Sequence, residues 1–106
     1  MARKRTLRLE RARAYGASLR LRDYRLIVFG SVARGDFVEE SDTDLLVVSA
    51  ERPAKARERM LSLGRARTGF SEVEALGWTP EEYDRRQRDG DRFALILEAE
   101  AVEVAP

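Results

Sequence analysis

The residues best suited to chemistry lie between a Gly-Ser pair and two aspartates. Gly30 and Ser31 end one short apolar run, and Asp42 and Asp44 begin another. Where a strand turns into a helix, a Gly-Ser pair presents backbone N–H groups and a hydroxyl to phosphate oxygens. Aspartates two positions apart on a strand point to the same side and can hold hard cations such as Mg²⁺. The combination favours phosphoryl transfer assisted by paired metal ions.

The composition excludes several other kinds of chemistry. The 106 residues include no cysteine and no histidine, which excludes disulfides, thiolate catalysis, zinc sites of the usual kind and an imidazole base. Any reaction must therefore use carboxylates, hydroxyls, basic groups and a borrowed metal ion.

Two predicted strands position the Gly-Ser pair and the aspartates. Residues 25–29 are short, branched and apolar and end at a glycine, which is typical of a buried strand. Residues 31–35 then predict one or two turns of helix, 36–41 a polar loop and 43–48 a second strand.

Helices are predicted on either side of these strands. Apolar spacings of three and four predict an amphipathic helix over about residues 7–21. Pro53 favours the start of another, which would run to about residue 63 with Ala56, Met60 and Leu61 facing inward.

The last third of the chain contains a third strand and a well-marked helix start. Alternation over residues 70–76 predicts a strand with two different faces. Thr79 can cap a helix that begins at Pro80, with Glu82 completing a capping box and Gly90 ending it. The remaining predicted elements are a short helix around 93–97 and an extended piece at 102–104.

This order of elements predicts an α/β (α+β) fold class, with a small sheet flanked by helices. The length favours one domain over residues 1–106. Because only three strands are well marked, a sheet edge should stay open, and we expect a partner chain in a homo- or hetero-oligomer.

Charge is distributed unevenly between the two parts of the chain. Residues 1–25 hold nine basic and two acidic side chains, whereas 26–106 hold eleven and seventeen. The basic end can be a solvated helix face, which we prefer, or a surface for nucleic acid or an acidic partner. With 43% hydrophobic residues, no long apolar run and no signal-peptide pattern, we expect a cytoplasmic protein without membrane association.

The spacing of the chemical residues also resembles a known family. Gly30-Ser31, ten further residues and then Asp42-Thr43-Asp44 match the signature of minimal nucleotidyltransferases, including MNT-type antitoxins, in the DNA polymerase beta superfamily. The resemblance covers most of the chain and includes Arg34-Gly35-Asp36 and Thr79-Pro80-Glu81-Glu82. It implies the nucleotidyltransferase fold, with a small mixed sheet.

The resemblance implies a catalytic and metal-binding set of three carboxylates. Asp42 and Asp44 would bind Mg²⁺, in a site for two ions. The third carboxylate would come from a later strand, where Glu74 fits best and would help to deprotonate the attacking hydroxyl. Glu72 lies on the same predicted face and stays an alternative.

The resemblance also implies a nucleotide-binding set. Gly30 and Ser31 would hold the triphosphate of ATP, and Arg34 would reach a phosphate. Two positions depart from the family pattern, because the third acid is Glu where Asp is frequent, and Val32 replaces a basic residue.

By resemblance, the reaction is the Mg²⁺-dependent transfer of a nucleoside monophosphate, AMP from ATP, to a hydroxyl with release of pyrophosphate. Small members of the family act as antitoxins that adenylylate a tyrosine of a HEPN-type toxin, so a HEPN-domain protein is the expected partner. The alternative is a binding module, weakly active or inactive, that neutralises such a partner by covering it. Nucleic acid is not expected as a direct ligand, although a nucleic-acid-binding subunit that uses the basic first helix is a third hypothesis.

Overall fold

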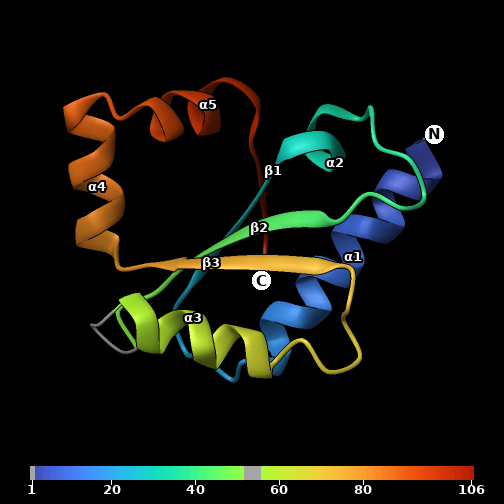
Figure 1. Cartoon of the computed structure of the whole chain (residues 1–106), viewed down its shortest axis with the longest axis horizontal. Helices are drawn as coiled ribbons and strands as arrows, with labels where there is room; N and C mark the ends of the chain where they lie inside the picture. Colours follow the sequence, from blue (N-terminus) through green and yellow to red (C-terminus); the bar gives the residue numbers. More distant parts are fainter. Residues whose placement is uncertain (1, 52–55) are drawn as a thin grey trace.

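A computed structural model describes residues 2–51 and 56–106 (Figure 1). The chain places a small sheet between helices. In order, the described elements are α1 (Ala2–Ser18), β1 (Arg25–Phe29), α2 (Gly30–Arg34), β2 (Thr43–Val48), α3 (Ala56–Arg65), β3 (Val73–Trp78), α4 (Pro80–Asp89), α5 (Arg92–Glu100) and β4 (Val102–Val104).

The described part of the chain forms one four-stranded mixed sheet in the order β3-β2-β1-β4. β1 pairs antiparallel with both β2 and β4, whereas β2 and β3 are parallel. The register sets Asp44 opposite Phe29 on one side and opposite Glu74 on the other. The predicted α+β class is therefore confirmed, and the extended piece at 102–104 is the fourth strand.

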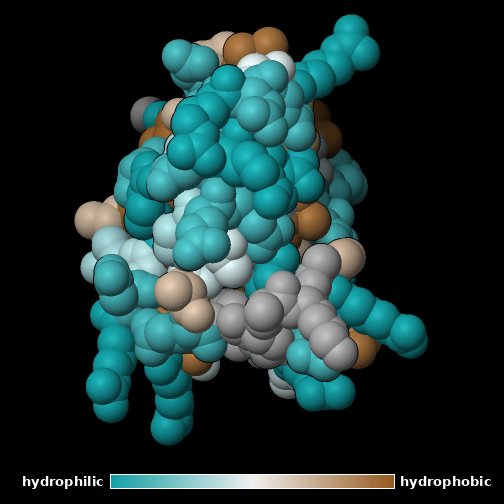
Figure 2. Space-filling view, turned by 90° about the vertical axis from the view of Figure 1, so that its left-hand side faces the viewer, coloured by the Kyte–Doolittle hydropathy of each residue, from teal (hydrophilic) through white to brown (hydrophobic). Residues whose placement is uncertain are grey.

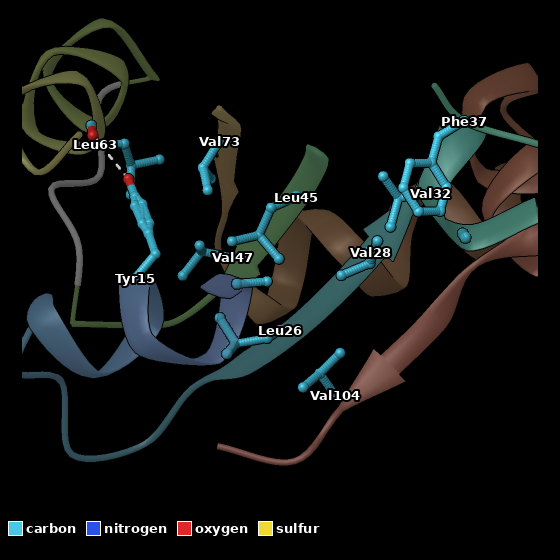
Figure 3. Packing of buried hydrophobic residues seen from close by; sticks show 12 residues of the cluster. Tyr15, Leu26, Val28, Val32, Phe37, Leu45, Val47, Leu63, Val73 and Val104 are labelled. Atoms are coloured by element: carbon cyan, nitrogen blue, oxygen red, sulfur yellow. Dashed lines mark hydrogen bonds between the residues drawn. The ribbon is translucent and has the colours of Figure 1, made fainter. Parts of the chain in front are cut away.

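One face of the sheet forms the larger core, against α1 and α3. Alternate strand residues point to this face, because successive side chains of a strand alternate. Inside the core the Tyr15 hydroxyl donates a hydrogen bond to the Leu63 carbonyl, 2.7 Å away, which joins α1 to α3 (Figure 3). The core includes Ala12, Tyr15, Leu26, Val28, Val32, Leu45, Val47, Leu63, Val73 and Val104.

The opposite face packs against α4 and α5. Its core combines Ile27, Leu46, Val48, Trp78 and Leu97 with partly buried aromatic residues. None of the residues of α4 is buried. This helix stands at the left of Figure 1, and Figure 2 shows that side of the molecule as mostly hydrophilic.

The helix start predicted at Thr79 is confirmed in detail. Glu82 N–H donates to Thr79 Oγ1, and Thr79 N–H donates to Glu82 Oε1, both at 3.1 Å. Gly90 ends α4 in the left-handed conformation. The N-terminal N–H groups of a helix lack partners within the helix, and this capping box satisfies two backbone donors at the start of α4.

Several predicted boundaries and one predicted helix face are wrong. α1 spans Ala2–Ser18, so it begins and ends before the predicted bounds of about 7–21. β3 begins at Val73 because residues 67–70 form turns and because its register follows β2 from Thr43 to Val48. In α3, Met60 and Leu61 are exposed, while Arg59 and Leu63 are buried in their place.

Arg59 accounts for the difference between the predicted and the observed inward face of α3. Its Nε donates to the Gly77 carbonyl, and its Nη2 lies 2.6 Å from Glu82 Oε1. These contacts satisfy a buried guanidinium, which hydrophobic periodicity assigns to solvent. The predicted start at Pro53 and the inward side chain of Ala56 lie outside the residues whose placement is described.

Candidate active site

The candidate active site begins at the turn from β1 into α2. Gly30 has φ +75°, a conformation that side-chain-bearing residues rarely adopt. A Cβ on Gly30 would collide with the carboxylate of Asp44. Glycine is therefore required here both by the backbone conformation and by the close approach of Asp44.

Ser31 lies in the first turn of α2, as predicted. Its carbonyl accepts hydrogen bonds from the N–H groups of Gly35 (2.9 Å) and Asp36 (3.1 Å), which close this short helix. Val32 and Ala33 of the same helix are buried. The backbone thus fixes the Gly-Ser turn against the sheet, beside the N-terminal end of β2.

Asp44 is partly buried, and the charges of two other carboxylates act on it. Loss of hydration raises the pKa of Asp44, and the negative charges of Asp42 and Glu74 raise it further. The Arg34 guanidinium offsets part of this rise. The fold therefore brings Asp42, Asp44 and Glu74 close enough to repel one another, although 30 residues separate Asp44 from Glu74 along the chain.

The two glutamates of the third strand region have different surroundings. Glu72 accepts from Arg11 Nε at 2.7 Å, and this hydrogen bond lowers the pKa of Glu72. Glu74 pairs across the sheet with Asp44 and lies 3.3 Å from Arg67 Nη2. Glu74 is thus the glutamate whose charge acts on Asp44, and Glu72 is held by Arg11 of α1.

Arg34 lies at the end of α2 within two ion pairs. Its Nε is 3.1 Å from Asp36 Oδ2, and its Nη1 is 3.2 Å from Glu100 Oε1 of α5. The side chain is 44% exposed, so the charge stays accessible to an incoming anion. Arg34 therefore adds positive potential beside the carboxylates.

The carboxylates fit a hard cation by donor type. Mg²⁺ takes oxygen ligands and needs only one or two protein carboxylates, because water and phosphate complete its coordination. Asp42 and Asp44 supply such oxygens, and a cation would relieve the repulsion that raises the pKa of Asp44. Across residues 2–51 and 56–106, no three acidic, His or Cys side chains already converge to hold one ion. Glu74 instead contacts Arg67.

Motif spacing and hydrophobic periodicity do not single out several arginines that contact this site. Arg67 lies beside Glu74, and Arg5 and Arg8 of α1 donate to carbonyls of α2 and of the loop before β2. The partners of Arg5 and Arg8 are distant in sequence and are mostly backbone atoms, whereas Arg67 contacts the nearby Glu74. For Arg5 and Arg8 the one sequence signal is the density of arginine near the start of the chain.

A Gly-Ser turn that faces carboxylates on adjacent strands of a small mixed sheet defines the class of nucleotidyltransferases. The family model described as "Nucleotidyltransferase domain" matches residues 9–99, and the chain belongs to this family. The resemblance found in the sequence is thereby confirmed.

Two similar proteins agree with this assignment. A Methanocaldococcus jannaschii protein described as a "Putative protein adenylyltransferase" is 45% identical over 40 residues. That match spans 37% of this chain and 40% of the relative. A crystal structure titled as that of a "putative nucleotidyltransferase" from Sulfolobus solfataricus has a TM-score of 0.62 and 25% identity. The structural match covers 79% of this chain and 78% of the Sulfolobus solfataricus chain.

The helices in the described part of the chain differ from membrane spans. None of them combines the length and the apolar character that crossing a bilayer requires.

Proposed function

We propose that residues 1–106 form a single minimal adenylyltransferase unit that transfers AMP from ATP to a hydroxyl of another protein. The observation that carries this proposal is the contact between Gly30 and Asp44. It sets a phosphate-binding turn directly against the aspartate that lies opposite Glu74. Family membership supports nucleotide transfer, and the name of the M. jannaschii relative supports a protein acceptor.

Each residue has a defined role in the proposed reaction. Gly30 and Ser31 bind the triphosphate through backbone N–H groups and a hydroxyl. Asp42 and Asp44 hold two Mg²⁺ ions, with Glu74 as an additional ligand. When bound, these ions stabilise the negative charge that develops on the phosphoryl and leaving-group oxygens.

The transfer itself exchanges one bond at phosphorus for another. The acceptor hydroxyl oxygen bonds to the α-phosphorus of ATP, and the bond from that phosphorus to the bridging oxygen breaks, which releases pyrophosphate. Glu74, beside Asp44, accepts the hydroxyl proton. Arg34 attracts the triphosphate, since its exposed guanidinium lies near the carboxylates.

The proposed acceptor is a tyrosine of a HEPN-domain partner, so that the protein acts as an antitoxin in the cytoplasm. Nucleic acid is not favoured, because α1 arginines such as Arg8 and Arg11 already donate to this chain's own atoms. A second candidate is a binding module that covers its partner without transfer. The contact of Glu74 with Arg67 favours it, because that contact draws the third carboxylate toward a cation of the chain itself.

The decisive experiment is transfer of label from α-labelled ATP. Purified protein is incubated with Mg²⁺, with and without a HEPN candidate, and protein-bound label and pyrophosphate are measured. We expect label on the partner that disappears in the double variant D42N/D44N. Asp84→Asn, an exposed aspartate of α4, is the matched control and should keep full activity. A stable complex without label, for every nucleotide tried, would instead establish the binding module.

A further inference from the structure

Three arginines on one side of α1 each contact a different segment of the candidate active site. Arg5, Arg8 and Arg11 are three residues apart, so they follow one another along one helix face. We propose that they are positioning residues that fix the places of the three catalytic segments relative to one another. This inference rests on the proposed transfer reaction, because it concerns the same site.

Arg5 holds the helix that follows the Gly-Ser turn. Its Nε donates to the Val32 carbonyl at 3.3 Å, and its Nη2 donates to the Ala33 carbonyl at 3.0 Å. Carbonyls in the last turn of a helix have no partner within that helix. Arg5 satisfies them and fixes the short α2, whose first residue is Gly30, to α1.

Arg8 holds the loop that leads into β2. Its Nη2 donates to the Glu39 carbonyl at 2.9 Å, and its Nη1 to the Ser41 carbonyl at 2.6 Å. The same Nη1 lies 3.2 Å from Thr43 Oγ1. The hydrogen bonds to residues 41 and 43 are on either side of Asp42 and fix the backbone that carries it.

The Arg8 contacts require a guanidinium. The group also lies over the Phe37 ring, 5.3 Å from its centroid, so that hydrogen bonds in its plane combine with a cation–π contact. A lysine ammonium is a point charge and cannot reproduce two separate nitrogen donors at fixed spacing. Replacement of Arg8 by Lys should therefore loosen the loop while it conserves charge.

Arg11 holds the turn that precedes β3. Its Nε donates to Glu72 Oε1 at 2.7 Å, its Nη2 donates to the Gly69 carbonyl, and it lies over the Phe70 ring. These partners come shortly before Glu74 in the chain. The Arg11 contacts therefore fix the entry to the strand that carries the third carboxylate.

α1 can act as a fixed support for these segments because it is packed into the core. Ala12 and Tyr15 are fully buried, and the Tyr15 hydroxyl binds the Leu63 carbonyl. Figure 1 shows the first half of α1 beside the loop into β2. Arg13, on the same helix, donates instead to the Ala105 carbonyl, beyond β4 at the opposite end of the sheet from Asp44. Arg13 therefore offers a matched control.

The test compares Arg8→Lys with Arg13→Lys. For each variant, kcat and KM for ATP are measured in the transfer assay, Mn²⁺ affinity is measured by electron paramagnetic resonance, and thermal unfolding is recorded. We expect Arg8→Lys to lower kcat and Mn²⁺ affinity by about 10-fold or more, because partners that orient ligand groups typically contribute this much. KM should change less than kcat. Arg13→Lys should stay within about twofold of the wild type in both quantities.

A larger set of variants guards against a purely structural effect. Arg8→Ala should recover part of the lost kcat when methylguanidinium is added, whereas Arg13→Ala should not respond. If Arg8→Lys keeps kcat and Mn²⁺ affinity within about twofold of the Arg13→Lys values, this proposal is wrong, whereas the proposed function still stands. Wild-type protein that neither binds Mn²⁺ nor transfers nucleotide overturns the proposed function as well. The two failures are therefore distinguishable.

Discussion

The carboxylate of Asp44 occupies the space that a Cβ would take on Gly30. Asp44 lies in β2 and pairs with Phe29, the last residue of the adjacent antiparallel strand β1 and the residue before Gly30. A glycine at this turn lets the acidic side chain approach the first residue of α2. The close approach of this carboxylate to the Gly-Ser turn, which the proposed function uses to bind metal and phosphate, therefore depends on the absence of one side chain.

The first prediction concerns that absence. Gly30→Ala should lower the free energy of unfolding by about 2–4 kcal/mol and kcat by about 100-fold, because it adds a clash with Asp44 to a strained positive φ. Gly35→Ala is the matched control: Gly35 has φ +87° but nothing near its missing Cβ. Gly35→Ala should lower the free energy of unfolding by only about 1–2 kcal/mol.

A double-variant cycle isolates the clash. In an Asp44→Ala background, the cost of Gly30→Ala should fall to about that of Gly35→Ala, because only the backbone strain is left. Chemical denaturation of the four proteins measures this coupling. Equal costs of Gly30→Ala in the two backgrounds would show that the Asp44 carboxylate moves aside freely.

The second prediction concerns the repulsion among the carboxylates. Because the pKa of Asp44 is raised in the folded protein, ionised Asp44 destabilises the fold at pH 7. Asp44→Asn should therefore raise Tm by about 2–5 °C in the absence of divalent cations. The gain should shrink as the pH falls through the folded pKa and vanish below the ordinary carboxyl value of about 4, where both states are protonated.

Mg²⁺ provides a second test of the same repulsion. It should raise the Tm of the wild type but have little effect on Asp44→Asn, because the variant has lost a ligand charge. Asp84→Asn, on the exposed surface of α4, should respond to Mg²⁺ as the wild type does. A lower Tm for Asp44→Asn at pH 7 would show that Asp44 stabilises the fold, contrary to the sign that its raised pKa requires.

The third prediction separates the two glutamates near β3. Glu74→Gln should lower kcat by about 100-fold or more, because Glu74 pairs with Asp44 and is the proposed proton acceptor. Glu72→Gln should lower kcat by less than about 10-fold, because Glu72 contacts Arg11 and not the aspartates. Transfer of label from ATP measures both. Reversal of this order would make Glu72 the third carboxylate.

Glu72 should also have its own pH signature. Its pKa is lowered by the hydrogen bond from Arg11, so its contribution to stability is present above the unfolded carboxyl pKa and is lost as the pH falls through the folded value. Glu72→Gln should cost at most about 1 kcal/mol at pH 7, because both side chains are partly exposed. The cost should disappear in acid.

How far the sequence predicts this structure depends on whether a signal is local. β1, β2 and β4 lie at their predicted residues, because their apolar runs are short and are bounded by glycine or polar segments. The spacing between Gly30 and Asp44 could be recognised for the same reason. The predicted start of β3 is wrong because Phe70 is apolar yet lies in a turn packed against Tyr15. Pairing with β2 decides where the strand begins.

The contacts that single-sequence patterns do not predict are mainly those of arginine. Arg8 holds backbone atoms more than 30 residues away, and Arg59 is buried although it lies on a helix with exposed Met60. Hydrophobic periodicity assigns every arginine to solvent. It takes account of the charge of the side chain but not of the groups that this side chain contacts in the folded protein. These partners are set by the tertiary fold, which only the structure supplies.

The fourth prediction tests the buried arginine directly. Arg59 is 1% exposed, and its Nη2 lies 2.6 Å from Glu82 Oε1. Glu82→Gln keeps an oxygen to accept from Thr79 N–H but removes the negative charge, so it should cost about 2–3 kcal/mol, because a buried cation loses its counter-charge. Thr79→Ala, which removes only the hydroxyl of the cap, should cost about 1 kcal/mol.

Replacement of both charges shows whether the pair itself stabilises the protein. In the double variant R59M/E82Q, an apolar side chain replaces the cation, and most of the loss from Glu82→Gln should be recovered, because desolvation of both ions offsets their attraction. Chemical denaturation at pH 7 gives the comparison. A double variant at least as unstable as Glu82→Gln would mean that the ion pair stabilises the contact between α3 and α4 by more than its desolvation costs. The ion pair would then add to the packing that holds α3 through Leu63.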